Sequence, residues 1–425
     1  MSTPSGPTAP GAEHRHGGAY RVYGYRWVVL AVFMAVNLTI QVLWIAYAPV
    51  MSTATEYYGV SDLKIGLLSM VFMIVFVPLS LPASWAIDTL GFKKAVGFGA
   101  VLMGVFGVLR GLAGADYTLA LLCTVGLAVA QPFLMNAWTK VAANWFPEGE
   151  RATSVGLVTL ASLVGTALGM VLSPALVKTM SLSSVQLVYG VAAAVAAGAF
   201  LLLARSQPAT PPCEAGREER SLMVAGLRHA LTVRPFVVYL GVVFVGMGIF
   251  NGVTTWVEEI ISPRGFSSTD AGTLGALMLL GGIIGAVLLS ALSDRRHRRV
   301  PFLIAGVTLG IPGLLAVTFA ESGLLLFAGA FVLGFFLVSV SPIGMQYAAE
   351  ITYPTPEGTS AGLIQLCGQA AVVFVYVMEA MRTDDGAFTP SLLLAAGLLV
   401  VCAVALTRLR DGASRAAPSS QPAAP

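Results

Sequence analysis

Trp44 is the side chain in this sequence best suited to recognising a positively charged solute. It lies in residues 27–50, a run of 24 residues without a charge. A quaternary ammonium has no hydrogen to donate, so the face of an aromatic ring recognises it best, with about 2 kcal/mol once both are desolvated. Phe250 follows Trp44 by 206 residues and offers a second ring. The alternative role, packing against neighbouring helices, is the usual one for such rings.

Amide side chains within apolar runs form a second group with binding chemistry. Its main members are Gln131 and Gln369. The same question arises, with less support from the sequence, for Asn37, Gln41, Asn136, Gln346 and Gln365. A buried amide without a partner costs about 1–3 kcal/mol, so each of them needs one. The partner is either a substrate or water in a central cavity, or a neighbouring helix. Both possibilities stay open at this point.

Titratable side chains avoid the middle of every apolar run. Proton-coupled carriers usually keep a titratable group in the membrane despite its cost, so a facilitative carrier is favoured. Glu258, Glu259 and Glu379 lie near the outer ends of such runs and are the remaining candidates for ion coupling. They are nevertheless expected to be solvated charges at the rim. All four histidines also lie outside the runs, which leaves haem without an axial ligand there. No metal site and no cofactor are expected.

Residues 88–94 form a charged turn between two apolar runs. Asp88 is followed by Gly91, Lys93 and Lys94, and Asp294 begins a shorter version of the same pattern. A carboxylate is attracted to the positive end of a helix dipole. We therefore predict that Asp88 contacts the start of the helix that opens near residue 359 and locks a gate.

The composition requires these residues to be held within a membrane. Of the 425 residues, 56% are hydrophobic and only 11% are charged, against about 25% charged in soluble domains. A soluble enzyme is therefore excluded. With about 20 residues for each span, the apolar content suffices for about twelve. The predicted helices are 25–50, 62–87, 95–113, 117–139, 151–177, 183–204, 233–258, 270–292, 300–319, 323–348, 358–381 and 389–408.

The basic residues predict the orientation of this all-α bundle. With twelve spans, both termini share one side of the membrane. Nineteen of the 24 lysines and arginines fall on that side. The other five are Lys64, Arg110, Lys178, Arg264 and Arg382. Because basic residues concentrate on the inner side, both termini are predicted to be cytoplasmic.

Two halves of six helices are predicted from an internal repeat. Asp88 and Asp294 are 206 residues apart, and so are Thr-Ser-Val-Gly-Leu at 153–157 and Thr-Ser-Ala-Gly-Leu at 359–363. Parallel six-helix repeats are typical of transporters that hold substrate between two halves. The predicted divisions are a disordered tail at 1–19, a first bundle at 20–204, a cytoplasmic linker at 205–232, a second bundle at 233–409 and a disordered tail at 410–425.

The acidic residue, glycine and basic pair after the second predicted helix resemble the signature of the major facilitator superfamily. Within it, the chain is similar to the feline leukaemia virus subgroup C receptor-related family. The patches that carry this similarity are residues 41–47, 68–70, 78–85, 136–146, 350–354 and 357–363. That family implies import of choline and related amines, with haem export attributed to some members.

The resemblance also implies site residues. In that family a tryptophan on the first helix and glutamines on the fourth and eleventh line the amine site, and Trp44, Gln131 and Gln369 occupy the matching positions. The family's tyrosine on the seventh helix aligns with Asn251, beside Phe250. One wall of the aromatic cage is therefore lost or moved by one residue.

The sequence as a whole favours an alternating-access transporter of a small organic cation in the cell membrane. It is expected to work as a monomer in the lipid bilayer, with a small-molecule substrate, no nucleic-acid partner and no enzymatic activity. Export of haem or another amphipathic molecule is one alternative. An organic-anion carrier is another, disfavoured because no Arg or Lys falls in mid-membrane. A membrane receptor without transport activity is the third.

Overall fold

The computed structural model describes residues 22–210, 228–296, 298–352, 355 and 357–410. Every regular element in these ranges is helical. The predicted tail at 1–19, nearly all of the tail at 410–425 and most of the linker at 205–232 lie outside the described residues.

Within the described ranges, twelve helical segments are long and apolar enough to cross a membrane, which confirms the predicted number of spans. The first group of elements is α1 (Arg26–Ile45), η1 (Ala48–Val50), α2 (Met51–Tyr58), α3 (Asp62–Leu90), α4 (Phe92–Leu112), α5 (Tyr117–Met135), α6 (Trp138–Trp145), α7 (Glu148–Leu176) and α8 (Leu182–Leu203). The second group is α10 (Arg234–Thr255), α11 (Val257–Ile261), η2 (Ser262–Arg264), α12 (Ser268–Arg296), α13 (Val300–Phe319), α14 (Gly323–Ile351), α15 (Glu357–Ala370), α16 (Val372–Ala380) and α17 (Thr389–Thr407).

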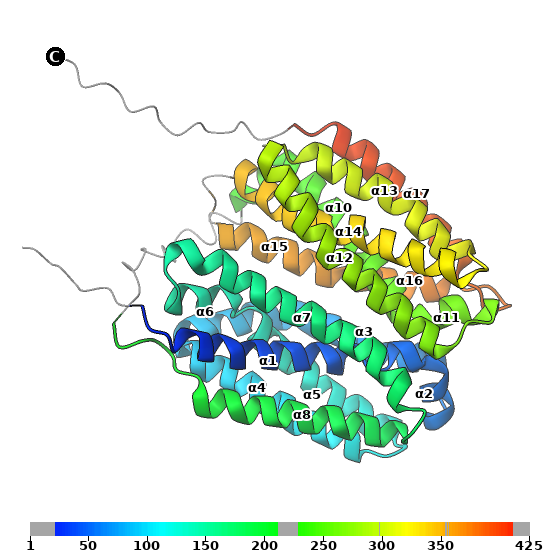
Figure 1. The fold of residues 1–425 in the computed structure, drawn as a ribbon, viewed down its shortest axis with the longest axis horizontal. Helices are drawn as coiled ribbons and strands as arrows, with labels where there is room; N and C mark the ends of the chain where they lie inside the picture. Colours follow the sequence, from blue (N-terminus) through cyan, green and yellow to red (C-terminus); the bar gives the residue numbers. More distant parts are fainter. Residues whose placement is uncertain (1–21, 211–227, 297, 353–354, 356, 411–425) are drawn as a thin grey trace, which may run out of the picture.

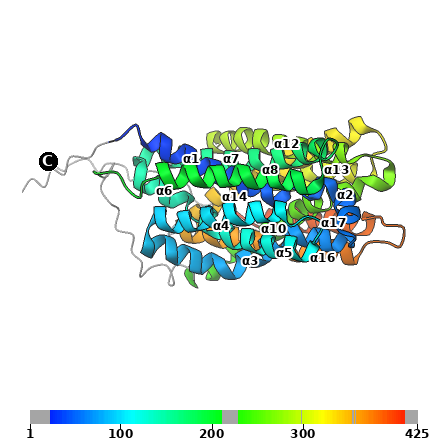
Figure 2. The same cartoon turned by 90° about the horizontal axis from the view of Figure 1, so that it is seen from below.

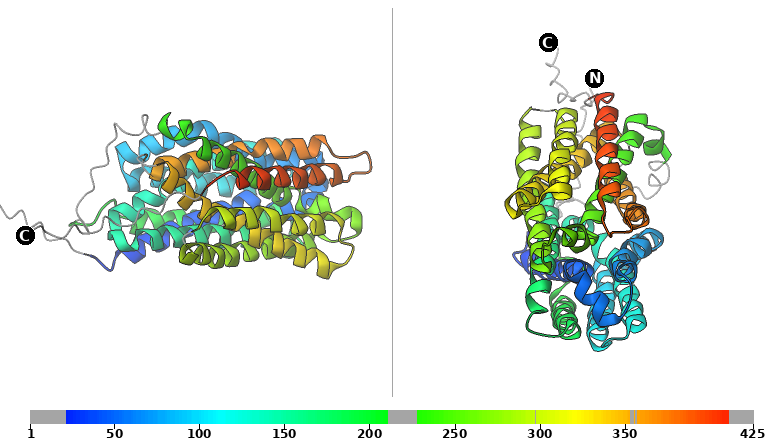
Figure 3. Two further views of the ribbon diagram at one scale, coloured as in Figure 1. Left: turned by 90° about the horizontal axis from the view of Figure 1, so that it is seen from above. Right: turned by 90° about the vertical axis from the view of Figure 1, so that its right-hand side faces the viewer.

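The long helices run side by side along the longest axis of the molecule (Figure 2). Seen end-on, α1–α8 form one group and α10–α17 the other, and we call these the N-half and the C-half (Figure 3). Between them, α3 contacts α10, α15 and α16, and α7 contacts α12. The end at which residues 203–210 lie is called the linker end, and the end with α2 and α11 the far end (Figure 1). Which side of the membrane each end faces stays a prediction.

Four of the predicted spans are interrupted, which the hydropathy pattern did not indicate. The breaks fall between α1 and η1, α5 and α6, α10 and α11, and α15 and α16. The first has a clear cause, because Pro49 has no N–H with which to continue the helix and disfavours helix in the residue before it. The breaks matter because discontinuous helices expose backbone groups inside transporters.

Small residues let the helices approach closely where the bundle is tightest. A Cβ atom added to Gly190 of α8 would lie 2.2 Å from the carbonyl oxygen of Gly107 on α4. Between the halves, a Cβ atom on Gly272 of α12 would lie 2.3 Å from the carbonyl oxygen of Met170 on α7. Glycine is required at such contacts because any side chain would push the helices apart.

Candidate functional site

Trp44 lies in the last turn of α1, directly before the break in the first span. Its indole Nε1 donates to the carbonyl oxygen of Ser69 on α3, at 3.2 Å, and the Ser69 hydroxyl donates to the carbonyl oxygen of Trp44, at 3.3 Å. These two bonds fix the ring against α3. Trp44 is 7% exposed, so it faces neither open solvent nor lipid.

Gln41 and Gln131 carry the amide oxygens that lack partners in this region. Both Oε1 atoms are buried and accept no hydrogen bond from any residue that the structure describes. Gln41 is three residues before Trp44, so the two side chains share one face of α1. Gln131 lies on α5, which contacts α1. The N-half therefore holds a tryptophan and two unused acceptors on two touching helices.

The remaining predicted site residues lie on two touching helices of the C-half. Phe250 and Asn251 are on α10, and Gln369 is on α15. A Cβ atom on Gly368 would lie 3.3 Å from Met247 Cγ, so α15 packs on α10 one turn from Phe250. Asn251 is 5% exposed, and neither its amide nor that of Gln369 forms a hydrogen bond within the described ranges.

The structure does not join these two sets of residues directly. No hydrogen bond links any two of the six among the described residues, but α3 contacts all four of their helices. Trp256 lies where the two halves meet, and it was not among the predicted site residues. It is 0% exposed, and its ring would lie 2.5 Å from a Cβ atom on Gly66 of α3. In the internal repeat, Trp256 corresponds to Val50, which lies 206 residues earlier and is not aromatic. The repeat therefore did not single out Trp256.

Of the predicted gate residues, Asp88 lies at the end of α3, and Gly91, Lys93 and Lys94 lie at the start of α4. Asp88 Oδ1 accepts a hydrogen bond from Lys140 Nζ at 3.0 Å, within the N-half. Gly91 has a φ of +86°, a left-handed conformation that glycine adopts without strain. The side chains of Asp294 and Thr359 lie outside the described residues. The Asp88 contact with the start of α15 therefore stays a prediction.

Arg110 corrects the sequence-based assignment of charges. It was counted among surface charges, yet it is 1% exposed inside the N-half. Its Nη1 donates to the carbonyl oxygen of Leu43 at 3.0 Å, and its Nη2 to Gln186 Oε1 at 2.7 Å. Its Nε atom has no acceptor, and no carboxylate among the described residues pairs with it. The guanidinium is thus a buried positive charge next to the backbone of Trp44.

A cluster of charged residues joins the halves at the far end. Arg382 Nη1 donates to Asp62 Oδ2 of α3 at 2.7 Å, and its Nη2 to Glu259 Oε2 of α11 at 2.9 Å. The backbone N–H of Ser52 on α2 donates to Glu258 Oε2 at 3.0 Å. Because Ser52 and Asp62 belong to the N-half and the other residues to the C-half, these bonds hold the far end closed.

The expectation that Glu258 and Glu259 are solvated rim charges is wrong. They are 3% and 8% exposed, because the short helix α11 packs against α2 and η1 of the N-half as well as against α12 of its own half. Burial raises the pKa of Glu259 to about 7, with a further rise from the Asp62 and Glu258 carboxylates that the guanidinium of Arg382 opposes. Hydropathy averaged over a span did not separate these carboxylates from exposed ones.

Acidification is expected to stabilise the closed far end. Glu259 faces Asp62, Glu258, Glu379 and Arg382 when this end is closed. When the far end opens and Glu259 is exposed to water, the pKa of Glu259 returns toward about 4.3. Below pH 7, Glu259 therefore binds a proton more readily in the closed form than in the open form, so acidification stabilises the closed form. Above pH 7 neither form binds this proton, and the stabilisation is lost.

Spin-label distances across the far end will measure this effect between pH 8 and pH 5.5. The ratio of closed to open molecules is expected to rise roughly tenfold over that range. Glu259→Gln, which cannot titrate, is expected to remove most of the dependence. A wild-type distribution that does not change with pH would contradict the assignment to Glu259.

Comparisons with known proteins identify the family of this chain. Residues 28–376 and 260–424 match the Major Facilitator Superfamily. Solute carrier family 49 member A3 of Xenopus tropicalis is 31% identical over 392 residues, covering 88% of this chain and 81% of that protein. The choline/ethanolamine transporter FLVCR1 of Felis catus is 27% identical over 407 residues, covering 90% and 72%.

The fold is shared with solved structures at lower identity. A bacterial homologue of the human lysosomal transporter Spinster, in an inward-facing and unoccupied conformation, superposes with a TM-score of 0.71 at 15% identity, covering 91% of this chain and 97% of that one. These findings confirm both resemblances read from the sequence and the predicted fold class. The chain belongs to the major facilitator superfamily and is a multi-pass membrane transporter.

Proposed function

We propose that this protein is a facilitative transporter of a small organic cation of the choline or ethanolamine kind, located in the cell membrane. Substrate binds between the halves, to Trp44, Gln41 and Gln131 from the N-half and to Phe250, Asn251 and Gln369 from the C-half. The two halves then rock about it. The relatives named for choline and ethanolamine transport support this substrate class. We expect the transporter to act as a monomer, without a nucleic-acid partner and without enzymatic activity.

The two unused amide oxygens carry the proposal. Gln41 Oε1 and Gln131 Oε1 are buried without a donor, which costs about 1–3 kcal/mol each if nothing fills them. A hydroxyl or an ammonium N–H supplies the missing donor. The Trp44 ring on the same face of α1 is suited to the charged end of such a molecule. An amino alcohol satisfies both features at once.

Transport of an organic anion is the second candidate, and Arg110 is the observation that favours it. The sequence argument against anions relied on the absence of a buried cation, and Arg110 removes that argument. The guanidinium has an unused Nε–H, but it lies over the Tyr47 ring and donates to Gln186. Its bond to the Leu43 carbonyl gives it a structural role at the negative end of the α1 dipole. We therefore place it second.

Thermal stabilisation of the purified protein separates these candidates. Choline and ethanolamine are expected to raise the melting temperature, whereas haem and a panel of organic carboxylates are expected to leave it unchanged. Uptake of labelled choline into proteoliposomes without an ion gradient then tests the facilitative mode. Stabilisation by carboxylates alone, lost in Arg110→Met, would overturn the proposal in favour of the anion carrier.

Gln131→Met is expected to weaken choline binding without lowering the stability of the empty protein. Methionine has a similar volume and removes a buried acceptor that has no donor, so the melting temperature should stay equal or rise. Choline loses one hydrogen bond, which corresponds to roughly a five- to tenfold weaker Kd.

Gln186→Met is the matched control for this variant. Gln186 is equally buried, but its Oε1 accepts from Arg110, so its loss should lower the melting temperature. If Gln131→Met instead destabilised the protein and left choline binding intact, Gln131 would be a structural residue.

A further inference from the structure

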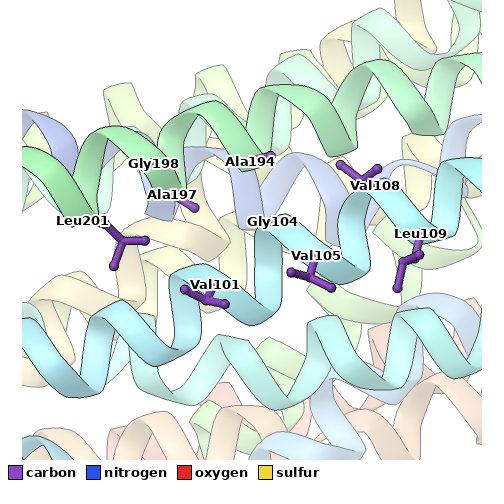
Figure 4. A pocket seen from close by; sticks show the side chains of 9 residues that line it. All are labelled: Val101, Gly104, Val105, Val108, Leu109, Ala194, Ala197, Gly198 and Leu201. Atoms are coloured by element: carbon purple, nitrogen blue, oxygen red, sulfur yellow. The ribbon is translucent and has the colours of Figure 1, made fainter.

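A groove between α4 and α8 opens on the side of the N-half that faces away from the C-half (Figure 4). Its central part has a volume of about 450 Å³, and a second part of about 570 Å³ continues it toward the linker end. Val101 and Leu201 line both parts, so the two form one continuous, shallow groove along the helix pair. No predicted substrate residue lines it.

The groove is bounded by apolar side chains of α4, and its floor at Gly198 of α8 is not filled by any side chain. Val101, Val105 and Leu109 of α4 are 43%, 49% and 43% exposed, which places them toward the hydrocarbon of the bilayer in a membrane protein. Gly198 of α8 lies on the floor, and a Cβ atom added to it would find no other atom within 4 Å. The floor is therefore open at Gly198, where a chain of CH₂ groups can lie.

The end of the groove nearest the linker is positively charged. Lys93 and Lys94 line it together with Ser206. Neither lysine has an ion pair or a hydrogen bond with any side chain in the described ranges, because Asp88, the carboxylate closest to them in sequence, pairs with Lys140. Two ammonium groups at a membrane interface thus lack a protein counter-ion.

We propose that this groove is a binding site for one anionic phospholipid, with an acyl chain along α4 and α8 and the phosphate on Lys93 and Lys94. The dimensions agree. Gly97 to Leu109 spans about 18 Å of helix, against about 15 Å for the hydrocarbon of one leaflet. Lysines beside an apolar groove are the arrangement that anionic headgroups recognise. The groove faces away from the C-half, so the proposal does not depend on the proposed substrate, although its two lysines belong to the predicted gate turn.

Lipid retention by the full-length protein in native mass spectrometry tests the proposal. The two probes are phosphatidylglycerol and the uncharged monogalactosyldiacylglycerol with the same acyl chains, neither of which carries choline or ethanolamine. Wild type is expected to retain phosphatidylglycerol roughly tenfold or more in preference to the galactolipid. The double variant Lys93→Gln/Lys94→Gln should lose that preference, whereas Lys178→Gln, an exposed lysine at the far end, should keep it.

A second pair of variants tests the acyl-chain part of the groove. Gly198→Leu fills the open floor and should reduce retention of both lipids. Gly397→Leu, on an exposed helical position of α17 with equally open surroundings, should not. Equal retention of the two probes by wild type, or a preference that survives loss of both lysines, would overturn the proposal. So would a dimer mass that disappears in Gly198→Leu, because the groove would then be a contact between copies.

Discussion

Trp44→Leu is expected to weaken choline binding by roughly 30-fold, while Trp44→Phe keeps most of the affinity. The reason is that a desolvated cation on an aromatic face gains about 2 kcal/mol, which leucine cannot supply and phenylalanine supplies in part. Both variants lose the indole N–H bond to the Ser69 carbonyl equally. Isothermal titration of choline against both variants therefore isolates the contribution of the ring.

Trp85→Leu is the control for this comparison. Trp85 is on α3 and 66% exposed, so its loss should change neither the affinity nor the melting temperature appreciably. Equal affinities for Trp44→Leu and wild type would mean that Trp44 only packs against α3. A loss of affinity as large in Trp44→Phe would point instead to the bond with Ser69.

Arg382→Gln is expected to open the far end. Arg382 is the cation between Asp62 of the N-half and Glu259 of the C-half, and without it these carboxylates repel each other. The side chains of Arg382 and Asp62 are 23% and 24% exposed, so the effect lies between those of surface and buried ion pairs. We expect the ratio of closed to open molecules to fall roughly tenfold.

Distances between spin labels at Glu56→Cys on α2 and Thr269→Cys on α12 report this change, because both positions are exposed at the far end. Arg264→Gln is the matched control. Arg264 lies at the same end, but it donates to the carbonyls of Ile260, Val317 and Ala320, which all belong to its own half. Its replacement should leave the distance distribution unchanged. An equal shift in both variants would show that any lost arginine loosens this end.

The number of spans could be predicted because each needs a run of apolar residues that hydropathy detects directly. The superfamily could be predicted because the charged turn at residues 88–94 and the repeat are visible in one dimension. The four breaks within the spans could not be predicted in this way, although Pro49 explains the first of them. The others depend on tertiary contacts, such as the bond from Trp256 Nε1 to the Val375 carbonyl, which sequence spacing does not encode.

The placement of charges was the weakest part of the prediction. Arg110 lies three residues from the end of α4, where a long side chain can reach water or turn inward, and its partners Leu43 and Gln186 are 67 and 76 residues away. Glu258 and Glu259 raised the same ambiguity at the end of the seventh span. In contrast, an amide in an apolar run is unusual in itself, so Gln41 and Gln131 could be singled out from the sequence. Their Oε1 atoms are buried without a partner in the described ranges, and their part in binding substrate stays a prediction.

The most direct test of the account is a cryo-electron microscopy structure of the protein saturated with choline. We predict density for the ammonium on the face of Trp44, with the hydroxyl within hydrogen-bonding distance of the Gln41 or Gln131 amide oxygen and Gln369 closing the site from the C-half. Density beside Arg110, or no ordered choline between the halves at a concentration that supports uptake, would contradict the account.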